Sequence, residues 1–194
     1  MLFVSMSRTA AFALALTLMA APSRAEPRAI DAQRSTLTVF VYKSGVFSAF
    51  ADDHVIRAPI AAGSISTDAP LAVDVRVEAG KLVVLDPKLS ADKRAEVQTR
   101  MLGPEVLDAA RYSEIAFKST SIEAAGPDRW TVTGEVTIHG KTRPITFAVA
   151  GRDGHYRGTV ALKQRDFGIE PISIGGGTVK VKDELKVEFD VVVR

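Results

Sequence analysis

The residues best suited to chemistry form one short cluster, Asp52-Asp53-His54. Carboxylates beside an imidazole can hold a metal ion or act as an acid–base pair. A metal site usually needs three or more such ligands, and no second histidine stands near His54 in the sequence. We therefore predict no metal site here. His54 is kept as a candidate polar contact to a ligand, with an ordinary loop turn as the alternative.

No other motif indicates catalysis. Cysteine is absent, which excludes disulfides, thiolate metal sites, a cysteine nucleophile and a cysteine-linked lipid anchor. A serine hydrolase needs a nucleophile, a base and an orienting group, and no serine stands in a Gly-x-Ser-x-Gly turn. The glycine run at 175–177 lies between predicted strands, unlike a phosphate-binding loop. We predict that the protein is not an enzyme and has no catalytic residues.

Apolar side chains are the stronger candidates for a functional site. Ligand cavities are lined mainly by hydrophobic and aromatic residues, with a few polar groups that orient the ligand. Each aromatic residue alone could equally fill a packed core. With His54, the candidate ligand-binding residues are Phe40, Tyr42, Phe47, Phe50, Phe117, Trp130, Ile138, Phe147 and Phe167.

A three-stranded meander is expected to position the central candidates. Residues 130–138 alternate between apolar and polar types, and the alternation resumes over 145–149 after a turn at Gly140. This period of two is typical of a strand with one buried face. Ile115 and Phe117 open a preceding strand, which ends at a Gly-Pro-Asp turn signal. The meander must bury its apolar face against other elements.

Strand patterns recur through most of the remaining chain. They are found at 36–42, 55–61, 64–67, 71–78, 82–85, 156–162 and 179–193. Residues 89–110 differ, because Ser90 is a suitable N-cap and Gly103-Pro104 would break a helix. We expect a helix, a kink and a second short helix there, packed across one end of the sheet.

These elements predict an all-β fold with a single domain. About eight strands with one apolar face have too few helices to cover an open sheet, whereas closure buries that face and removes edge strands. We predict a single antiparallel eight-stranded β-barrel with a short helical insertion near residues 89–110. A barrel of this size either fills with side chains or holds one small ligand. Two packed sheets are the alternative.

Residues 1–25 have the features of a cleaved secretory signal peptide. Arg8 supplies a positive charge, residues 10–21 are apolar, and Ser23-Arg24-Ala25 fits the cleavage pattern. The apolar run is shorter than the ~18–20 residues that a membrane-spanning helix needs, which disfavours an uncleaved anchor. We expect a mature domain over 26–194 in the periplasm. Its 23 basic residues balance 23 acidic ones, so no basic patch suggests nucleic acid.

Two motifs carry a family resemblance. Residues 112–119 read YSEIAFKS, and residues 134–145 read GEVTIHGKTRPI. Together they resemble the signature of the YceI-like family, and QRDFGI at 164–169 is similar to that family's late motif. The resemblance extends from about Ile30 to the C-terminus. Relatives often have a second histidine where Asp52 or Asp53 stands here, and this departure further weakens a metal site.

The resemblance implies a secreted, lipocalin-like barrel that binds an isoprenoid lipid. The expected ligand is a polyisoprenoid, such as a polyprenol, or the tail of an isoprenoid quinone, with no other cofactor. The helical insertion or the loop 45–54 would be the gate through which the lipid enters. Transient contact with a membrane and formation of a homodimer are the associations expected of the protein. A competing hypothesis is a filled barrel that serves as a structural or stress-response accessory of a membrane redox complex. A weaker one is an enzyme acting on a small exported substrate.

Overall fold

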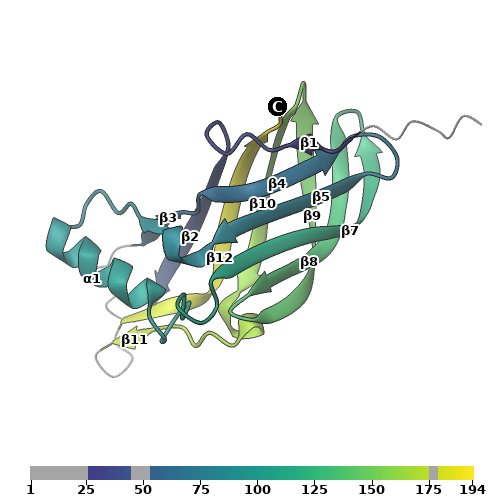
Figure 1. The fold of residues 1–194 in the computed structure, drawn as a ribbon. Coiled ribbons are helices and arrows are strands. Elements are labelled where there is room, and N and C mark those ends of the chain that lie inside the picture. The colour runs from purple at the N-terminus through teal and green to yellow at the C-terminus, as the bar shows by residue number, and fades with distance from the viewer. Residues whose placement is uncertain (1–25, 45–52, 175–178) are drawn as a thin grey trace, which may run out of the picture.

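The computed structural model describes residues 26–44, 53–174 and 179–194. In this part of the chain, one strongly curled antiparallel sheet is accompanied by a single α-helix at one end (Figure 1). The helical elements are α1 (Ala91–Leu102) and the 3-10 turns η2 (Ala79–Lys81) and η3 (Gln164–Phe167). The strands are β1 (Arg28–Ala29), β2 (Thr36–Ser44), β3 (His54–Arg57), β4 (Ile60–Ser66), β5 (Ala72–Glu78), β6 (Val83–Val84), β7 (Glu114–Gly126), β8 (Arg129–Ile138), β9 (Lys141–Arg152), β10 (His155–Lys163), β11 (Ser173–Ile174) and β12 (Val179–Val192).

The sheet is curled because strands that follow one another in the sequence pair near opposite ends of the sheet. Its path is β1-β4-β5-β7-β8-β9-β10-β12-β2-β3-β6, with β11 beside β12. Strand β3 pairs with β2, while β4, only two residues further along the chain, pairs with β5. A second link is the bridge between Ile30 and Val193, which brings the N-terminal segment to the end of β12. The result is a barrel-like sheet with a concave inner face (Figure 1).

The all-β class, the antiparallel pairing and the helix near 89–110 are confirmed, but the closed barrel of eight strands is not. In the described residues the sheet is strongly curled and its path ends at β1 and at β6. Eleven strands lie on the sheet path in the described residues. The predicted strand 55–61 is split at Ala58-Pro59, because proline has no amide hydrogen for the ladder. Strands β1 and β11 have only two residues each, too few for alternation to reveal, whereas β6 lies within the predicted strand 82–85.

The predicted meander is present as β7, β8 and β9. Ten residue pairs join β8 to β9, from Arg129 opposite Ala150 to Ile138 opposite Lys141. The connecting turn is His139-Gly140, and both residues have positive φ, 51° and 69°. That geometry is required of a two-residue type I′ hairpin turn, and glycine adopts it without strain. The turn predicted at Gly140 is therefore confirmed.

Helix α1 matches the first half of the predicted insertion. The Ser90 hydroxyl accepts a hydrogen bond from the Lys93 amide at 3.4 Å, and the helix ends before Gly103. The predicted second helix is wrong, since residues 103–111 form consecutive turns. The Leu107 amide donates back to the Met101 carbonyl at 3.1 Å, which folds the segment under the helix. A helix of one turn is costly to nucleate, so burial of Leu107 decides the local structure.

The Gln98 side chain attaches α1 to the edge of the sheet. Its Oε1 accepts from the Val84 amide and its Nε2 donates to the Leu82 carbonyl, each at 2.8 Å. The side-chain amide thus replaces the neighbouring strand that β6 lacks on this side. Within the described residues, no helix has the length and apolar character needed to cross a membrane.

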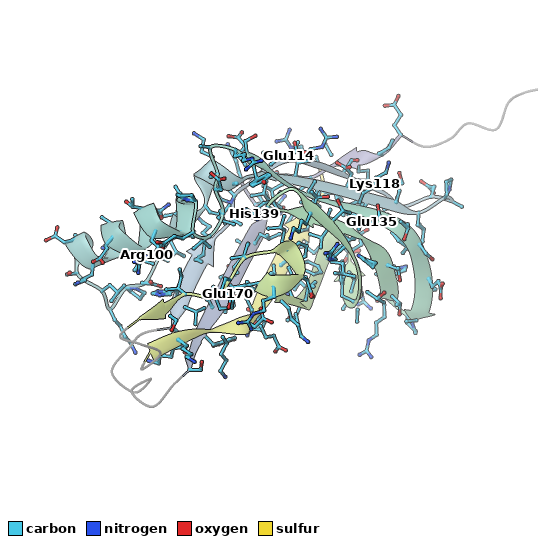
Figure 2. All side chains as sticks on the ribbon, turned by 90° about the horizontal axis from the view of Figure 1, so that it is seen from below. Arg100, Glu114, Lys118, Glu135, His139 and Glu170 are labelled. Carbon is cyan, nitrogen blue, oxygen red and sulfur yellow. The ribbon has the colours of Figure 1, made fainter. Side chains whose placement is uncertain are left out.

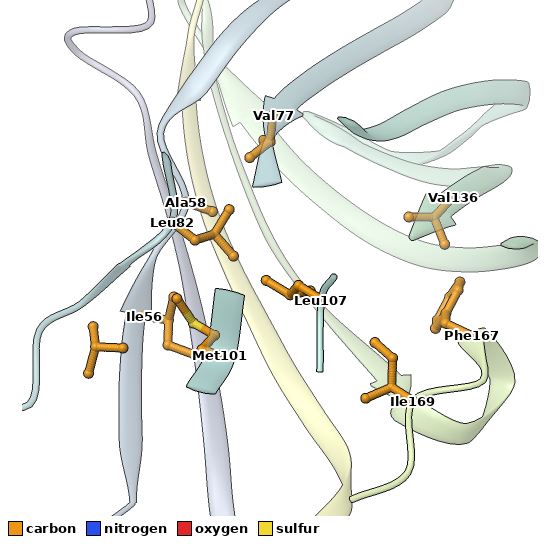
Figure 3. Close-up of a cluster of buried hydrophobic side chains, with 10 residues drawn as sticks. Ile56, Ala58, Val77, Leu82, Met101, Leu107, Val136, Phe167 and Ile169 are labelled. Carbon is orange, nitrogen blue, oxygen red and sulfur yellow. The ribbon is translucent and has the colours of Figure 1, made fainter. Parts of the chain in front are cut away.

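Buried apolar residues form two clusters. The larger one lies at the α1 end, where β3, β5, β8, the helix and η3 meet (Figure 3). Its members are Ile56, Ala58, Val77, Leu82, Val84, Met101, Leu107, Val136, Phe167 and Ile169. The smaller cluster joins β1, β4 and β12 through Ile30, Ile60, Ile65, Val191 and Val193. Between these clusters, the concave face of the sheet encloses a cavity.

Candidate functional site

The inner face of the sheet surrounds a cavity of about 340 Å³. This volume falls in the range of about 300–1,000 Å³ typical of small-molecule sites. In the described chain, the polar residues on the cavity wall are Ser66, Thr67, Tyr156, Lys163 and Gln164, and the rest are apolar. Such a wall offers shape and apolar surface, and very few groups that could take part in a reaction.

Strand alternation places the apolar side chains on this wall. Side chains of a strand point alternately to opposite faces, so every second residue of a long strand faces the cavity. The predicted apolar face of the central strands points inward, and the alternating apolar residues of β12 do the same. Wall residues on these strands include Trp130, Val132, Val136, Ile138, Ile145, Phe147, Val149, Leu185, Val187, Phe189 and Val191. Charged side chains such as Lys118 and Glu135 lie on the outside (Figure 2).

Aromatic rings contact one another along the wall. The Phe147 ring centroid lies 5.4 Å from that of Phe117 and 5.7 Å from that of Phe189. Trp130 and Tyr156 form an edge-to-face pair with centroids 5.9 Å apart. Rings at these separations attract one another beyond their shared burial. The aromatic part of the wall is therefore held together by its own contacts.

The α1 end of the cavity is well covered. Met101, Leu107, Phe167 and Ile169 lie on the cavity wall and expose less than a tenth of their surface. Gly168 has φ of 73°, a left-handed conformation that ends η3 behind the buried Phe167. At the other end, near the turns that follow β4 and β7, the wall residues are partly exposed, as at Leu71, Ile122 and Trp130.

An ion pair fixes η3 at the covered end. Arg165 donates from Nε to Glu170 Oε2 at 3.2 Å, and a second guanidinium nitrogen contacts the other carboxylate oxygen. This hydrogen bonding lowers the pKa of Glu170 and raises the pKa of Arg165. The Arg165 amide also donates to Asp183 at 2.9 Å, which ties η3 to β12.

The structure brings five of the ten predicted site residues to the cavity wall. They are Phe117, Trp130, Ile138, Phe147 and Phe167. Phe40 and Tyr42 lie on the opposite face of β2, because Leu37, Val39 and Val41 occupy the inward positions. Lysines cover these two rings: Lys186 Nζ lies 4.5 Å from the Phe40 centroid and Lys182 Nζ 5.9 Å from the Tyr42 centroid. Phe47, Phe50 and most of the predicted gate loop lie outside the described residues.

His54 does not lie on the cavity wall but contacts a buried carboxylate. Its Nδ1 lies 2.6 Å from Asp86 Oδ2, and Asp86 Oδ1 accepts the Val55 amide at 2.7 Å. Asp86 is only 3% exposed, so its carboxyl oxygens depend on these two partners for hydrogen bonds. The pair holds the segment between β6 and α1 against β3. Sequence analysis did not single out Asp86, although an aspartate directly after a predicted strand and before Pro87 is a turn signal.

No group of three or more His, Asp or Glu side chains comes together within 26–44, 53–174 and 179–194 to hold a metal ion. His139 lies in the β8–β9 turn, where its Nδ1 is 3.3 Å from the Phe167 carbonyl and its ring packs edge-on to Tyr112. His155 is 3.8 Å from Asp190 on the outer face. Each described histidine thus has a local structural partner, and the apolar cavity remains the candidate site.

Comparison with known proteins supports this assignment of the fold. The family model described as the YceI-like domain matches residues 29–193. A UPF0312 protein of Vibrio parahaemolyticus is 33% identical over 136 residues, which cover 65% of this chain and 68% of that protein. A UPF0312 protein of Pseudomonas syringae pv. syringae is 34% identical over 139 residues, with 66% and 68% covered.

Two solved structures share the fold at low sequence identity. Burkholderia cenocepacia BcnA superimposes with a TM-score of 0.67 at 18% identity, covering 85% of this chain and 99% of that one. A domain from Saccharophagus degradans, described as polyisoprenoid-binding and implicated in plant cell wall breakdown, gives a TM-score of 0.60 at 16% identity. That comparison covers 86% of this chain and 97% of the domain.

Proposed function

The chain belongs to the YceI-like domain family, and we propose that it is an exported carrier for the apolar chain of an isoprenoid-type lipid. A polyprenol or the tail of an isoprenoid quinone is the expected ligand, held in the cavity inside the curled sheet. The observation that carries the proposal is the apolar wall of a cavity of about 340 Å³. The related Saccharophagus domain, which is described as polyisoprenoid-binding, supports the same ligand class.

The physical reason for such a carrier is the insolubility of a long apolar chain. Each buried CH₂ group contributes about 0.8 kcal/mol, so a chain of many carbons gains far more in the cavity than it would lose in mobility. No reactive group is needed for this task, which agrees with a binding family that is generally non-catalytic. Loading and release would require transient contact with a membrane.

Ligand-dependent stability tests the proposal. A ligand that binds only the folded state stabilises it by about 2.7 kcal/mol at a concentration of 100 times Kd. We expect geranylgeraniol, a linear isoprenoid alcohol, to raise the Tm of protein freed of lipid by organic extraction. The five-carbon alcohol prenol, which has the same allylic alcohol head group, should leave the Tm unchanged. Equal shifts in Tm with the two alcohols, or no shift with either, would contradict a cavity site for the isoprenoid chain of the ligand.

Export forms the second part of the proposal. Residues 1–25 lie outside the described residues, and the support is their signal-peptide pattern. We expect cleavage after Ala25 and a periplasmic protein that begins at Glu26. N-terminal sequencing of the protein from the periplasmic fraction checks this, and a protein that retains residues 1–25 would contradict it.

A further inference from the structure

Phenylalanines and glycines alternate across five neighbouring strands on the cavity wall. In the order of the sheet, they are Phe117 on β7, Gly134 on β8, Phe147 on β9, Gly158 on β10 and Phe189 on β12. We call these five residues the Phe–Gly row. The three rings all lie on the cavity wall, and each glycine occupies an inward position between two of them.

The two glycines are required for space and not for backbone conformation. Neither has a positive φ, and glycine within a strand weakens the strand. A Cβ at Gly134 would lie 2.6 Å from Cε2 and Cζ of Phe117 and 2.5 Å from the Lys118 carbonyl oxygen. A Cβ at Gly158 would lie 2.5 Å from Cζ of Phe189 and 2.6 Å from the Ala148 carbonyl oxygen. Carbon atoms normally approach to about 3.5–4.0 Å. Each glycine therefore leaves space for an outer ring and for the close approach of a neighbouring strand's backbone, and a Cβ would fill that space.

The row lies partway along the cavity. Along β8, wall residues extend beyond Gly134 in both directions, to Trp130 on one side and Ile138 on the other. These eight residue steps span roughly 26 Å at about 3.3 Å per residue. A volume of about 340 Å³ spread over that length is a narrow bore with room for one chain. Any ligand that occupies the length of the cavity must pass the row.

We propose that the Phe–Gly row sets the cross-section of the bore and selects a single linear chain against fused-ring lipids. The inference rests on the proposed function and adds the selectivity of the cavity for one shape of lipid. Because the outer rings lie against the glycines, they leave the bore open. A methyl group at either glycine would push a ring by about 1 Å toward the centre to regain contact distance, and would narrow the passage. Removal of a ring would widen it.

Trp130 provides a direct probe of occupancy. It is the single tryptophan of the chain and lies on the cavity wall beside Tyr156, away from the Phe–Gly row. Its fluorescence on titration with geranylgeraniol gives Kd. We expect Gly134→Ala and Gly158→Ala to raise this Kd at least tenfold. Gly80→Ala is the matched control, because a Cβ there meets nothing within 4 Å, and its Kd should stay within twofold of wild type.

Two further variants test the opposite change. Phe117→Leu and Phe189→Leu remove a ring without adding atoms over a glycine. We expect each to bind cholesterol, a fused-ring lipid, at least tenfold more tightly than the wild type does. The double variant Gly134→Ala with Phe117→Leu removes the ring that the new methyl group would displace. The contact of that methyl group with the Lys118 carbonyl remains in both variants, so the two are compared directly after circular dichroism has shown that both are folded. The Kd of the double variant for geranylgeraniol should be lower than that of Gly134→Ala.

The outcomes separate this inference from the proposed function. A folded Gly134→Ala protein with the wild-type Kd, or leucine variants that still reject cholesterol, would overturn the row as a selector. A double variant that binds no better than Gly134→Ala would do the same. If the wild type fails to bind geranylgeraniol at all, the proposed function falls and the inference falls with it.

Discussion

Phe40 and Phe147 are the same residue type on opposite faces of the sheet. Phe147 lies on the cavity wall between two other rings, whereas Phe40 lies outside beneath Lys186. We expect Phe147→Ala to change the Kd for geranylgeraniol more than tenfold and Phe40→Ala to change it less than twofold. Phe40→Ala should cost only about 0.5–1 kcal/mol of stability through the lost cation–π contact. Tryptophan fluorescence and chemical unfolding measure both quantities, and equal effects on Kd would contradict the assignment of faces.

The contact between His54 and Asp86 predicts a stability effect at a residue outside the cavity. Removal of the imidazole leaves a carboxylate that is 3% exposed with the Val55 amide as its remaining partner. Hydrogen bonds to charged groups contribute about 1.5–3 kcal/mol, and we expect a loss of that size in the free energy of unfolding for His54→Ala. His155→Ala is the control, because its 3.8 Å contact with Asp190 lies at the surface and should contribute below about 1 kcal/mol. Urea unfolding that shows equal losses would contradict a structural role for His54.

At the scale of residues, the sequence predicts which face of the sheet a side chain occupies better than it predicts which residue that side chain contacts. Strict alternation was enough to predict that Trp130, Ile138 and Phe147 face the interior. The same alternation places Phe40 and Tyr42 on the face of β2 opposite Leu37, Val39 and Val41, and aromatic character alone does not bring a ring into the cavity. Asp86 was missed since it is 32 residues from His54, and a long-range polar pair leaves no periodic signal.

At the scale of elements, the hydrogen bonds of Gln98 attach α1 to the β6 segment of the sheet, and this attachment leads to a prediction. Its side chain makes two hydrogen bonds of 2.8 Å to the backbone of the β6 segment. Gln98→Ala leaves the Val84 amide and the Leu82 carbonyl without these partners, and should cost about 1–3 kcal/mol. Amide hydrogen exchange at Val84 should become faster. Glu96→Ala, on the exposed face of the same helix, should stay within about 0.5 kcal/mol, and unchanged exchange at Val84 in Gln98→Ala would contradict the attachment.

The ion pair between Arg165 and Glu170 beside η3 predicts that the stability of the protein depends on pH. Hydrogen bonding to Arg165 lowers the pKa of Glu170 from its ordinary value of 4.5. The carboxylate is therefore favoured by folding, and its stabilising effect is present above pH 4.5 and is lost as pH falls through the lowered pKa. We expect Glu170→Gln to lower Tm at pH 7, and the difference in Tm from the wild type to shrink as pH falls below 4.5. Glu123→Gln, an exposed residue near the far end of β7, should show no such convergence. A Tm difference that persists at low pH would contradict the role of the charge.

Elements with regular patterns were predictable, and elements decided by tertiary contacts were not. Ser90 and Gly103 delimit α1 as expected, because capping is a local property. The second helix was replaced by turns because burial of Leu107 outweighs a weak local preference. Gly63 was interpreted as a break between strands, but it lies within β4, where a Cβ would be 2.6 Å from Ile30 Cδ1. The same need for space explains the glycines of the Phe–Gly row.

At the scale of the whole molecule, the strong curl of the sheet produces the cavity. The all-β class follows from the density of strand patterns, and a curled sheet follows from one-sided apolar faces. Whether the interior is filled or hollow depends on how rings and glycines fit between strands, and alternation alone does not record this fit. The apolar cavity of about 340 Å³ therefore becomes visible only in three dimensions.

The central claim is that this cavity holds one apolar chain in the native protein. Native mass spectrometry of protein purified from the cells that produce it naturally, before and after organic extraction, tests the claim most directly. We predict a mass above that of residues 26–194 by one lipid per chain, lost on extraction, and an isoprenoid lipid in the organic phase. The same experiment on Gly80→Ala should give the same excess mass. A native mass equal to that of the polypeptide alone, with no lipid in the extract, would contradict the account.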